Sequence, residues 1–312
     1  MAFTMHSHSG QFCPGHAKDD LEDIIKVAIA KGFTTMGITE HMPRTSLDDL
    51  YPEEMDDPQG SLAVLMPRHE AYLVEAQRLQ RKYASQLHLL IGFEGEWIRP
   101  EYGPLITSLS AHPSIDYFMG SLHHVNGIPL DFDAAFYQRC VDSAGGTEEN
   151  MFERYFDQQY EMLTTLKPRI VGHFDLPRLL SSDPNKNVRE WAGVWERVVR
   201  NLKFVAGYGG WLECNTSALR KGLAEPYPCR SIAEEWLGFG GKFTFSDDSH
   251  GIAQLGTNYV KGLDFLESLG VNEVWTLERS PHPWSEGQTE GKLTDKRVPI
   301  EDFKKVCQSW DV

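Results

Sequence analysis

The stretch Ala2-Phe3-Thr4-Met5-His6-Ser7-His8 begins with a strand-like run and ends in two histidines separated by one residue. Because residues i and i+2 of a strand point to the same face, these two imidazoles can bind one divalent metal ion. A related pattern, Asp248-Ser249-His250, follows another strand-like run much later in the chain. A single His-x-His pair is a weak signal of a metal site, so its significance depends on the residues at the ends of the other strands.

Strand-like and helical runs alternate along most of the chain. The predicted strands span residues 2–6, 34–39, 87–93, 115–122, 169–173, 211–215 and 242–246, with a further short run at 273–277. The predicted helices span residues 19–31, 68–85, 148–166, 188–206, 231–239 and 259–269, and a polar tail ends in one more helix. Residues 42–59 and 126–146 are interpreted as loop excursions. Repeated strand-then-helix units indicate a mostly parallel sheet, which is either open and doubly wound or closed into a barrel.

Composition and charge narrow the class of protein. The 312 residues are 41% hydrophobic and 24% charged, as in an ordinary globular protein, and we expect one domain over residues 1–312 because α/β barrels reach this length. The net charge of −15 disfavours nucleic acid and anionic membranes as partners. Five scattered cysteines without a CxxC motif predict reduced thiols in a cytoplasmic protein. We expect neither a signal peptide nor a membrane span, since no suitable apolar run is present. The oligomeric state stays open.

Metal-ligating residue types follow each of the seven main predicted strands. In chain order they are His6, His8 and His16; Glu40 and His41; Glu94 and Glu96; His123 and His124; His173 and Asp175; Glu213, Asn215 and Thr216; and Asp247, Asp248 and His250. Four further histidines lie away from strand ends and are interpreted as structural: His69, His88, His112 and His282. In a barrel all strand C-termini open onto one face, whereas an open sheet spreads them along an edge. Buried carboxylates and histidines are costly unless paired or metal-bound, so this convergence favours a barrel with a metal site.

The strand-end motifs occur in a fixed order along the chain. They are His6-x-His8, His16, Thr39-Glu40-His41, Gly92-Phe93-Glu94, Gly120-Ser121-Leu122-His123, Gly172-His173 and Ser246-Asp247-Asp248-x-His250. This set, which covers about residues 1–255, resembles the PHP (polymerase and histidinol phosphatase) superfamily. The stretches Gly172-His173-Phe174-Asp175 and Cys214-Asn215-Thr216-Ser217-Ala218-Leu219-Arg220-Lys221 are similar to its monofunctional histidinol-phosphate phosphatases.

The resemblance implies a distorted (β/α)7 barrel, similar to a TIM barrel, with three divalent metal ions at the C-terminal ends of the strands. Carried over by position, one ion is held by His6, His8, Glu94 and Asp248; a second by His16, His41 and His250; and a third by Glu94, His123 and His173, with Glu94 bridging. We choose His123 over His124 because it follows Gly-Ser-Leu, and Asp248 over Asp247 because it forms Asp-x-His. Such histidine-rich sites suit zinc or iron, and manganese remains an option.

The resemblance also implies hydrolysis of L-histidinol phosphate to L-histidinol and inorganic phosphate, a step of histidine biosynthesis. Three divalent ions bring about +6, of which two carboxylates and a bridging hydroxide offset about three, and the remainder suits a phosphate dianion. Asp248, His250 and Glu94 are expected to act at the reacting centre. Asp175 is expected to orient His173 or to protonate the leaving alkoxide; the alternative is a helix cap.

Arg220 is the first candidate for binding the small-molecule phosphate ester, because a guanidinium fork matches phosphate oxygens. Lys221 and Arg44 are further candidates. Glu40 and Glu96 either support the metal ligands or meet the amine and imidazole of the substrate. The acidic segment 48–57 is either a lid or a solvated loop.

Three other functions remain open at this point. A PHP-type phosphoesterase that acts on another small phosphomonoester would carry the same motifs. A metal-dependent amidohydrolase on a similar barrel would usually need a carboxylated lysine, and no lysine stands at a predicted strand end. A non-catalytic module that binds metal or phosphate is the third alternative.

Overall fold

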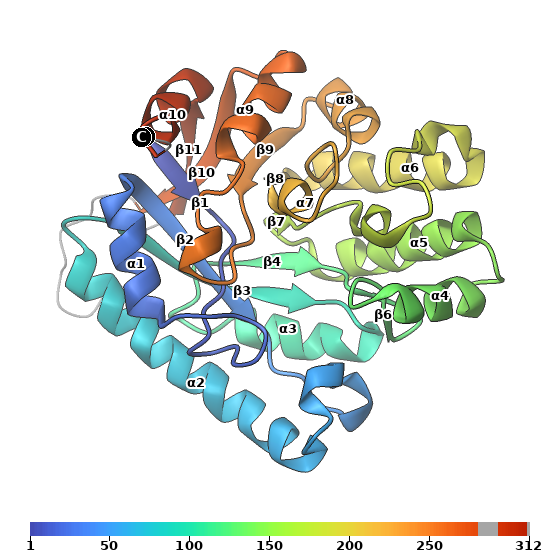
Figure 1. The fold of residues 1–312 in the computed structure, drawn as a ribbon, viewed down its shortest axis with the longest axis horizontal. Coiled ribbons are helices and arrows are strands. Elements are labelled where there is room, and N and C mark those ends of the chain that lie inside the picture. Colours follow the sequence, from blue (N-terminus) through green and yellow to red (C-terminus); the bar gives the residue numbers. More distant parts are fainter. Residues whose placement is uncertain (280–292, 311–312) are drawn as a thin grey trace.

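Seven parallel strands form one sheet, and each strand lies beside the next one along the chain (Figure 1). The sequence order is interrupted once, between β4 and β7, where two short strands form a separate hairpin. The computed structural model describes residues 1–279 and 293–310, so His282 lies outside the described residues. The strands are β1 (Ala2–Thr4), β2 (Phe33–His41), β3 (His88–Glu96), β4 (Tyr117–Ser121), β7 (Ile170–Val171), β8 (Trp211–Asn215) and β9 (Lys242–Ser246). A doubly wound sheet would reverse its strand order at a switch point, so the sequential order favours a barrel.

The first and last strands meet and bring the sheet close to a closed barrel. The main-chain N–H of Met5 donates to the carbonyl of Phe245 at 3.2 Å, and that of His8 donates to the carbonyl of Ser249 at 2.8 Å. The barrel is distorted, because β7 contributes only Ile170 and Val171 to its pairing with β4 and β8. The prediction of a distorted, seven-stranded β/α barrel is therefore confirmed.

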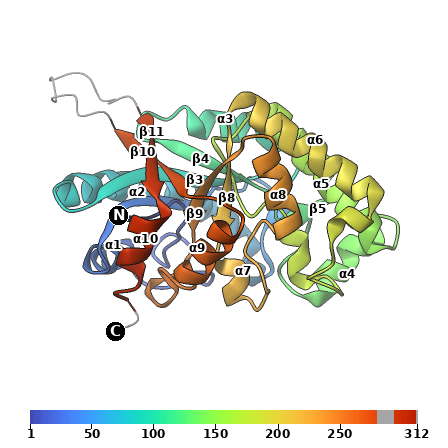
Figure 2. The same ribbon diagram turned by 90° about the horizontal axis from the view of Figure 1, so that it is seen from above.

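Helices surround the strands on the outside of the barrel (Figures 1 and 2). They are α1 (Leu21–Ala30), α2 (Pro58–Tyr83), α3 (Gly103–Ser110), α4 (Ala134–Ser143), α5 (Glu148–Leu166), α6 (Ala192–Tyr208), α7 (Ser217–Arg220), α8 (Arg230–Gly238), α9 (Tyr259–Ser268) and α10 (Ile300–Cys307). In α6, Val194, Val198 and Leu202 recur every four residues and are fully buried. Such a stripe packs a helix against a sheet, and removal of its apolar area from water stabilises the contact.

In the described part of the chain, six short 3-10 helices lie in the connections. They are η1 (Leu47–Asp49), η2 (Pro52–Glu54), η3 (Pro100–Tyr102), η4 (Leu176–Leu180), η5 (Val188–Glu190) and η6 (Ile252–Gln254). Among residues 1–279 and 293–310, no helix combines the length and the apolar character needed to cross a lipid bilayer.

Two segments are more regular than their sequences predict. Residues 126–146, expected as a loop, contain β6 (Ile128–Pro129), which pairs with β5 (His124–Val125) just before the segment, and then α4. Helix α2 begins at Pro58, ten residues earlier than expected, because Asp57 caps it by accepting a hydrogen bond from the Gly60 N–H at 3.1 Å. Proline at a first helical position favours this start.

An antiparallel hairpin of β10 (Glu273–Arg279) and β11 (Leu293–Pro299) lies at the end of the barrel where strands begin. Trp275 packs on Trp211, the first residue of β8, with ring centroids 6.3 Å apart. Lys242, the first residue of β9, donates to Asp295 of β11 at 3.2 Å. The polar tail thus contains a strand that the sequence did not predict, and the opposite end of the barrel remains for a binding site.

Candidate metal centre

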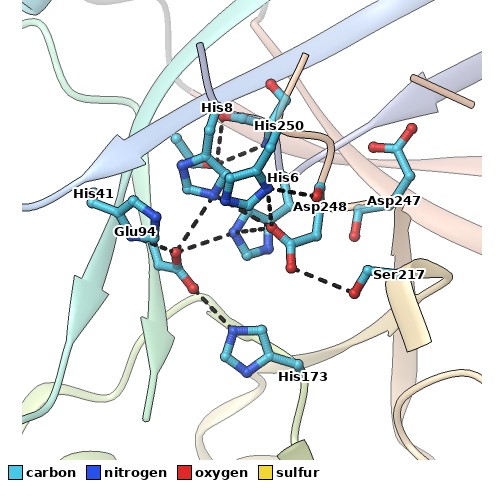
Figure 3. Close-up of polar contacts among 12 residues, drawn as sticks. His6, His8, His41, Glu94, His173, Ser217, Asp247, Asp248 and His250 are labelled. Atoms are coloured by element: carbon cyan, nitrogen blue, oxygen red, sulfur yellow. Dashed lines mark hydrogen bonds and ion pairs between the residues drawn. The ribbon is translucent and has the colours of Figure 1, made fainter. Parts of the chain in front are cut away.

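Nine candidate ligands gather where the barrel strands end, and Figure 3 shows several of them pointing toward one another. His6 and His8 follow β1, His16 lies farther along the same loop, and His41 ends β2. The others are Glu94 on β3, His123 after β4, His173 after β7, and Asp248 and His250 after β9. Because parallel strands finish at the same end of a barrel, positions far apart in sequence meet here.

Four of these residues present their donor atoms to one point. His6, His8 and Asp248 are buried, and their candidate ligand atoms lie within 4.8 Å of one another. The four cross-contacts are His6 Nε2 to Glu94 Oε2, 3.4 Å; His6 Nε2 to Asp248 Oδ1, 3.5 Å; His8 Nε2 to Glu94 Oε2, 3.5 Å; and His8 Nε2 to Asp248 Oδ1, 3.4 Å.

The spacing of this group fits a divalent ion better than a hydrogen-bond network. Neither His6 Nε2 nor His8 Nε2 has a hydrogen-bond partner among the described residues, although both atoms are buried. Buried polar atoms without partners are rare and call for an explanation. Ligands about 2.0–2.1 Å from a tetrahedral zinc ion lie about 3.3–3.4 Å from each other. The donor set and its spacing therefore fit a metal ion.

Glu94 has the geometry of a bridging carboxylate. Its Oε2 faces His6 and His8, while its Oε1 lies 3.0 Å from His173 Nε2 and 3.5 Å from His123 Nε2. Glu94, His123 and His173 form a separate buried group of potential ligands. One carboxylate therefore has one oxygen in each of two neighbouring groups.

A third group contains His8, His41 and His250, whose candidate ligand atoms also lie within 4.8 Å of one another. His16, expected in this set, lies nearby with its ring centroid 4.8 Å from that of His250. Its side chain is 40% exposed, and its Nδ1 contacts Glu53 Oε1 at 3.1 Å. The structure thus places His16 at the edge of the group, with His8 in its interior.

Glu96, expected near the substrate or behind the ligands, lies directly beside them. Its Oε1 is 2.7 Å from His41 Nδ1 and 3.9 Å from His123 Nδ1. Together with His41 and Glu94 it forms a fourth possible ligand group. Its Oε2 lies 3.7 Å from Arg44 Nη1, so a cation also stands on its outer side.

Electrostatic interactions hold the carboxylates of the centre in their charged form. Burial opposes ionisation of Glu94 and Asp248, but neighbouring imidazoles outweigh it and lower both pKa values well below normal. Burial also opposes charge on His6, yet the attraction of Asp248, Glu213 and Glu94 raises its pKa well above normal. In contrast, burial and the neighbouring His41 lower the pKa of His8 to about 3. Ion binding would therefore displace protons from some of these imidazoles.

Glu213, which the sequence interpretation counted among the strand-end residues but assigned to no metal ion, positions two of the histidines. Its Oε1 is 2.8 Å from His6 Nδ1, and its Oε2 accepts from the main-chain N–H of His173 at 2.8 Å. It also accepts from Asn215 Nδ2 at 3.0 Å and from the Ser246 hydroxyl. A carboxylate on the far nitrogen of a histidine fixes the tautomer that offers Nε2 to a metal. His250 is oriented similarly, through a 3.0 Å contact from Nδ1 to the Asp248 carbonyl.

In each of the neighbouring pairs Asp247-Asp248 and His123-His124, only one residue belongs to a group of potential metal ligands. Asp248 faces the imidazoles, whereas Asp247 points away from them and accepts from the Gly256 N–H and the Thr4 hydroxyl (Figure 3). Asp248 adopts a left-handed backbone conformation with φ of 49°, which turns its side chain relative to that of its neighbour. His123, and not His124, belongs to a group of potential ligands.

A cavity of about 410 Å³ opens beside the centre. Every predicted metal ligand except His6 and His8 lines it, together with Arg220 and Lys221. Arg220 donates to the carbonyl oxygens of Asp247 and Asp248 at 2.9 and 3.0 Å. The sequence interpretation missed four polar or aromatic residues of this wall: Tyr51, Asp131, Phe132 and Gln254.

Two residues expected to bind substrate line a smaller neighbouring cavity instead. Arg44 is buried and contacts both oxygens of Glu54 at 2.5 and 2.6 Å, so its guanidinium is already paired. Glu40 is buried and accepts from the N–H and hydroxyl of Ser9 at 3.0 and 2.5 Å. Because Ser9 follows His8 directly, Glu40 holds the loop that carries the first two histidines.

Asp175 also has structural partners. Its Oδ2 accepts from the Cys229 N–H at 2.9 Å and lies 3.1 Å from Arg178 Nε. It makes no side-chain cap to the 3-10 helix η4 that follows it. Asp175 thus anchors the segment after His173 and does not line the 410 Å³ cavity.

The acidic loop lies against the centre. Glu53 contacts His16, Glu54 pairs with Arg44, and Tyr51 stacks on His16 with ring centroids 6.1 Å apart. The loop therefore forms part of the cavity wall in this structure.

Comparison with known proteins identifies the family of this chain. A family model described as the PHP domain matches residues 4–217. A probable histidinol-phosphatase of Schizosaccharomyces pombe is 42% identical over 90% of this chain and 91% of the relative. The histidinol-phosphatase of Saccharomyces cerevisiae is 34% identical, with 96% of each protein covered. A crystal structure of histidinol phosphate phosphatase from Lactococcus lactis, complexed with zinc, L-histidinol and phosphate, has a TM-score of 0.62 and 18% identity, covering 88% of this chain and 96% of that one. The chain belongs to the PHP-domain family and, within it, to the histidinol-phosphatases.

Proposed function

We propose that this protein is a metal-dependent phosphomonoesterase that hydrolyses L-histidinol phosphate to L-histidinol and inorganic phosphate. The observation that carries the proposal is the group of donor atoms on His6, His8, Glu94 and Asp248, spaced 3.4–3.5 Å apart around one point. The adjoining cavity of about 410 Å³ is of a size that holds a small ester. The relatives named as histidinol-phosphatases support the choice of this ester.

The proposal includes three divalent ions. The proposed sets are His6, His8, Glu94 and Asp248 for the first ion; His16, His41 and His250 for the second; and Glu94, His123 and His173 for the third. When bound, such ions supply a nucleophile from water at neutral pH and neutralise the phosphate oxygens. The zinc in the Lactococcus lactis crystal structure supports zinc as one candidate.

Arg220 is the proposed phosphate-binding side chain. Its three hydrogen bonds, to the carbonyls of Asp247 and Asp248 and to the Thr257 hydroxyl, occupy three of its five N–H donors. Two donors therefore remain on a guanidinium that lines the cavity and is fixed next to Asp248. Lys221, which also lines the cavity, adds a second positive charge.

The remaining predicted residues act through others. Glu96 is assigned to His41, whose ring it contacts at 2.7 Å, and Glu40 to the loop at Ser9. Asp175 keeps the segment after His173 in place through Cys229. These are positioning residues, because none of the three lines the 410 Å³ cavity.

The test is to purify the protein without chelators, count metal ions per chain by elemental analysis, and measure phosphate release from a panel of esters. We expect about three ions, and the highest kcat/KM with L-histidinol phosphate among phosphorylated alcohols, sugars and nucleotides. One ion or none per chain would contradict the ligand sets. A better substrate elsewhere in the panel would identify a different phosphomonoesterase, and turnover of amides or lactones without phosphatase activity would refute the proposal.

A further inference from the structure

Two cavity residues, Asp131 and Phe132, lie on a short segment that is held at both ends. On one side, the main-chain N–H of Leu130 donates to the carbonyl of His123 at 2.8 Å. On the other side, Asp133 caps α4 by accepting from the Phe136 N–H at 2.8 Å. The two residues between these anchors are thus placed by a main-chain hydrogen bond to a candidate metal ligand on one side and by a helix cap on the other.

Asp131 has no evident structural task. It lines the 410 Å³ cavity and is partly exposed, and it forms no hydrogen bond or ion pair with the residues that the structure describes. The role most common for an aspartate before a helix, the N-cap, already belongs to Asp133. A carboxylate that lines a cavity and makes no hydrogen bond or ion pair there is available to a cation.

Phe132 is exposed where a large apolar side chain would normally be buried. Its side chain is 44% exposed, and it is one of few large apolar residues in the described part of the chain with such exposure. One side of its ring is supported by Phe136, at 5.4 Å and an interplanar angle of 73°. Because Phe132 also lines the cavity, a bound planar group can contact the ring.

The charges around the cavity are divided between different strands. Arg220 and Lys221 follow β8, whereas Asp131 follows the β5–β6 hairpin after β4, with β7 between these strands in the barrel. The cavity therefore combines basic side chains at one part of its wall with a carboxylate and an aromatic ring at another. A ligand with an anionic end, an ammonium group and a flat ring matches this division.

We infer that Asp131 and Phe132 select the alcohol half of the substrate: the Asp131 carboxylate pairs with its ammonium group, and the Phe132 ring packs on its imidazole. This inference rests on the proposed hydrolysis of L-histidinol phosphate and adds the source of its specificity. Both residues are specificity determinants, and neither belongs to the metal centre.

The experiment compares three substrates: L-histidinol phosphate, the analogue that lacks the amine, and L-alaninol phosphate, which keeps the amine but lacks the imidazole. Asp131→Asn should lower kcat/KM for both amine-bearing esters about 10- to 100-fold, because it removes the negative charge that strengthens the hydrogen bond to the ammonium group. It should leave the deamino ester within about twofold of its original value. Asp133→Asn is the matched control, since asparagine also caps a helix while the same charge is removed two positions away.

Phe132→Ala tests the ring. It should lower kcat/KM for the two imidazole-bearing esters about fivefold or more and leave L-alaninol phosphate nearly unchanged, whereas Phe132→Tyr keeps the ring and should retain activity. Metal content and thermal melting should match the unmodified protein in every variant.

Equal losses on all three esters, or no loss in Asp131→Asn, would overturn the inference while the preference of the unmodified enzyme for L-histidinol phosphate still stands. If the unmodified enzyme shows no such preference, the proposed function itself fails. The two failures are therefore distinguishable in one set of measurements.

Discussion

Two pairs of buried carboxylates at the same mouth of the barrel have different surroundings. Glu213 and Asp247 accept hydrogen bonds from main-chain N–H groups and hydroxyls, and Glu213 also contacts Nδ1 of His6, the ring nitrogen that does not face Glu94 and Asp248. Glu94 and Asp248 instead face the Nε2 atoms of His6 and His8 at 3.4–3.5 Å, and those two nitrogens have no hydrogen-bond partner among the described residues. Both pairs are almost completely buried, so burial alone does not distinguish them.

The two aspartates also differ in the direction in which their pKa values are shifted. Burial raises the pKa of Asp247 to about 6, although the Gly256 N–H opposes the shift. For Asp248, burial acts in the same direction, but the neighbouring imidazoles dominate and lower its pKa well below normal. The inner pair, Glu94 and Asp248, is built to stay charged and to meet a cation, while the outer pair supports the groups around it. Substitution of one carboxylate from each pair therefore distinguishes loss of metal binding from loss of structural support for the ligands.

The largest effect is expected for Asp248→Asn. The amide keeps the size of the side chain but removes one negative charge from the first ligand group, so kcat should fall about 1000-fold or more. Stopped-time phosphate release and elemental analysis should show lost activity together with lost metal. Asp247→Asn is the comparison from the outer pair, and it should retain metal and activity within about tenfold. Unchanged turnover in Asp248→Asn would mean that the centre is not catalytic.

A smaller effect is expected for Glu213→Gln. The amide still fits beside His6, but it no longer favours the tautomer that offers Nε2, so metal affinity or activity should fall about 10- to 100-fold. Competition with a chromophoric chelator measures the affinity, and KM for the ester should change little. If affinity is unaltered, Glu213 supports the fold only.

Removal of metal should lower thermal stability without unfolding the protein. A ligand present at 1000 times its dissociation constant stabilises the folded state by about 4 kcal/mol. The melting temperature should therefore drop on dialysis against a chelator and recover on addition of zinc. Asp248→Asn should show a smaller drop, because it has less bound metal to lose. Equal drops in both proteins would place the stabilising ion away from Asp248.

The smallest effect is expected for the pH dependence of the stability of the metal-free protein. The pKa of His6 is raised in the folded state, so its contribution to stability is complete below the unfolded pKa of about 6.5 and is lost as pH rises through the folded value. His41 and His173 shift in the same direction. The urea midpoint of the metal-free protein should therefore decline from pH 7 to pH 9, whereas that of the metal-bound protein should decline less. Parallel declines would indicate that the imidazoles do not exchange protons for metal.

The barrel could be predicted because the sequence pattern of each strand is local and recurs along the chain. Each strand is a short apolar run that ends in a polar ligand type, and the strands β8 and β9 were predicted at their observed limits. The strand β6 and the helix α4 within residues 126–146 were missed because Asn126, Gly127 and Pro129 lie close together, a composition typical of loops.

Positions that depend on long-range contacts were harder to predict. Glu213 contacts His6 across 207 positions of sequence, and no motif marks that contact. Arg44 was a plausible phosphate ligand by residue type, but its carboxylate partner Glu54 becomes visible only in three dimensions. Asp131 and Phe132 lie in a connection without a motif, so only the cavity draws attention to them.

The near-closure of the barrel between β1 and β9 has a consequence for how the protein is made. Strand β1, which is synthesised before the rest of the barrel, gains its second neighbour only after almost the whole barrel has been synthesised, since Thr4 and Asp247, which hydrogen-bond across this seam, are 243 positions apart. Contacts of such sequence separation form slowly, because the chain entropy must be lost before they stabilise the fold. His8 and Asp248 stand on the two sides of the seam. A metal ion bound by both residues would therefore stabilise the contact between β1 and β9 once the last strand of the barrel has been synthesised.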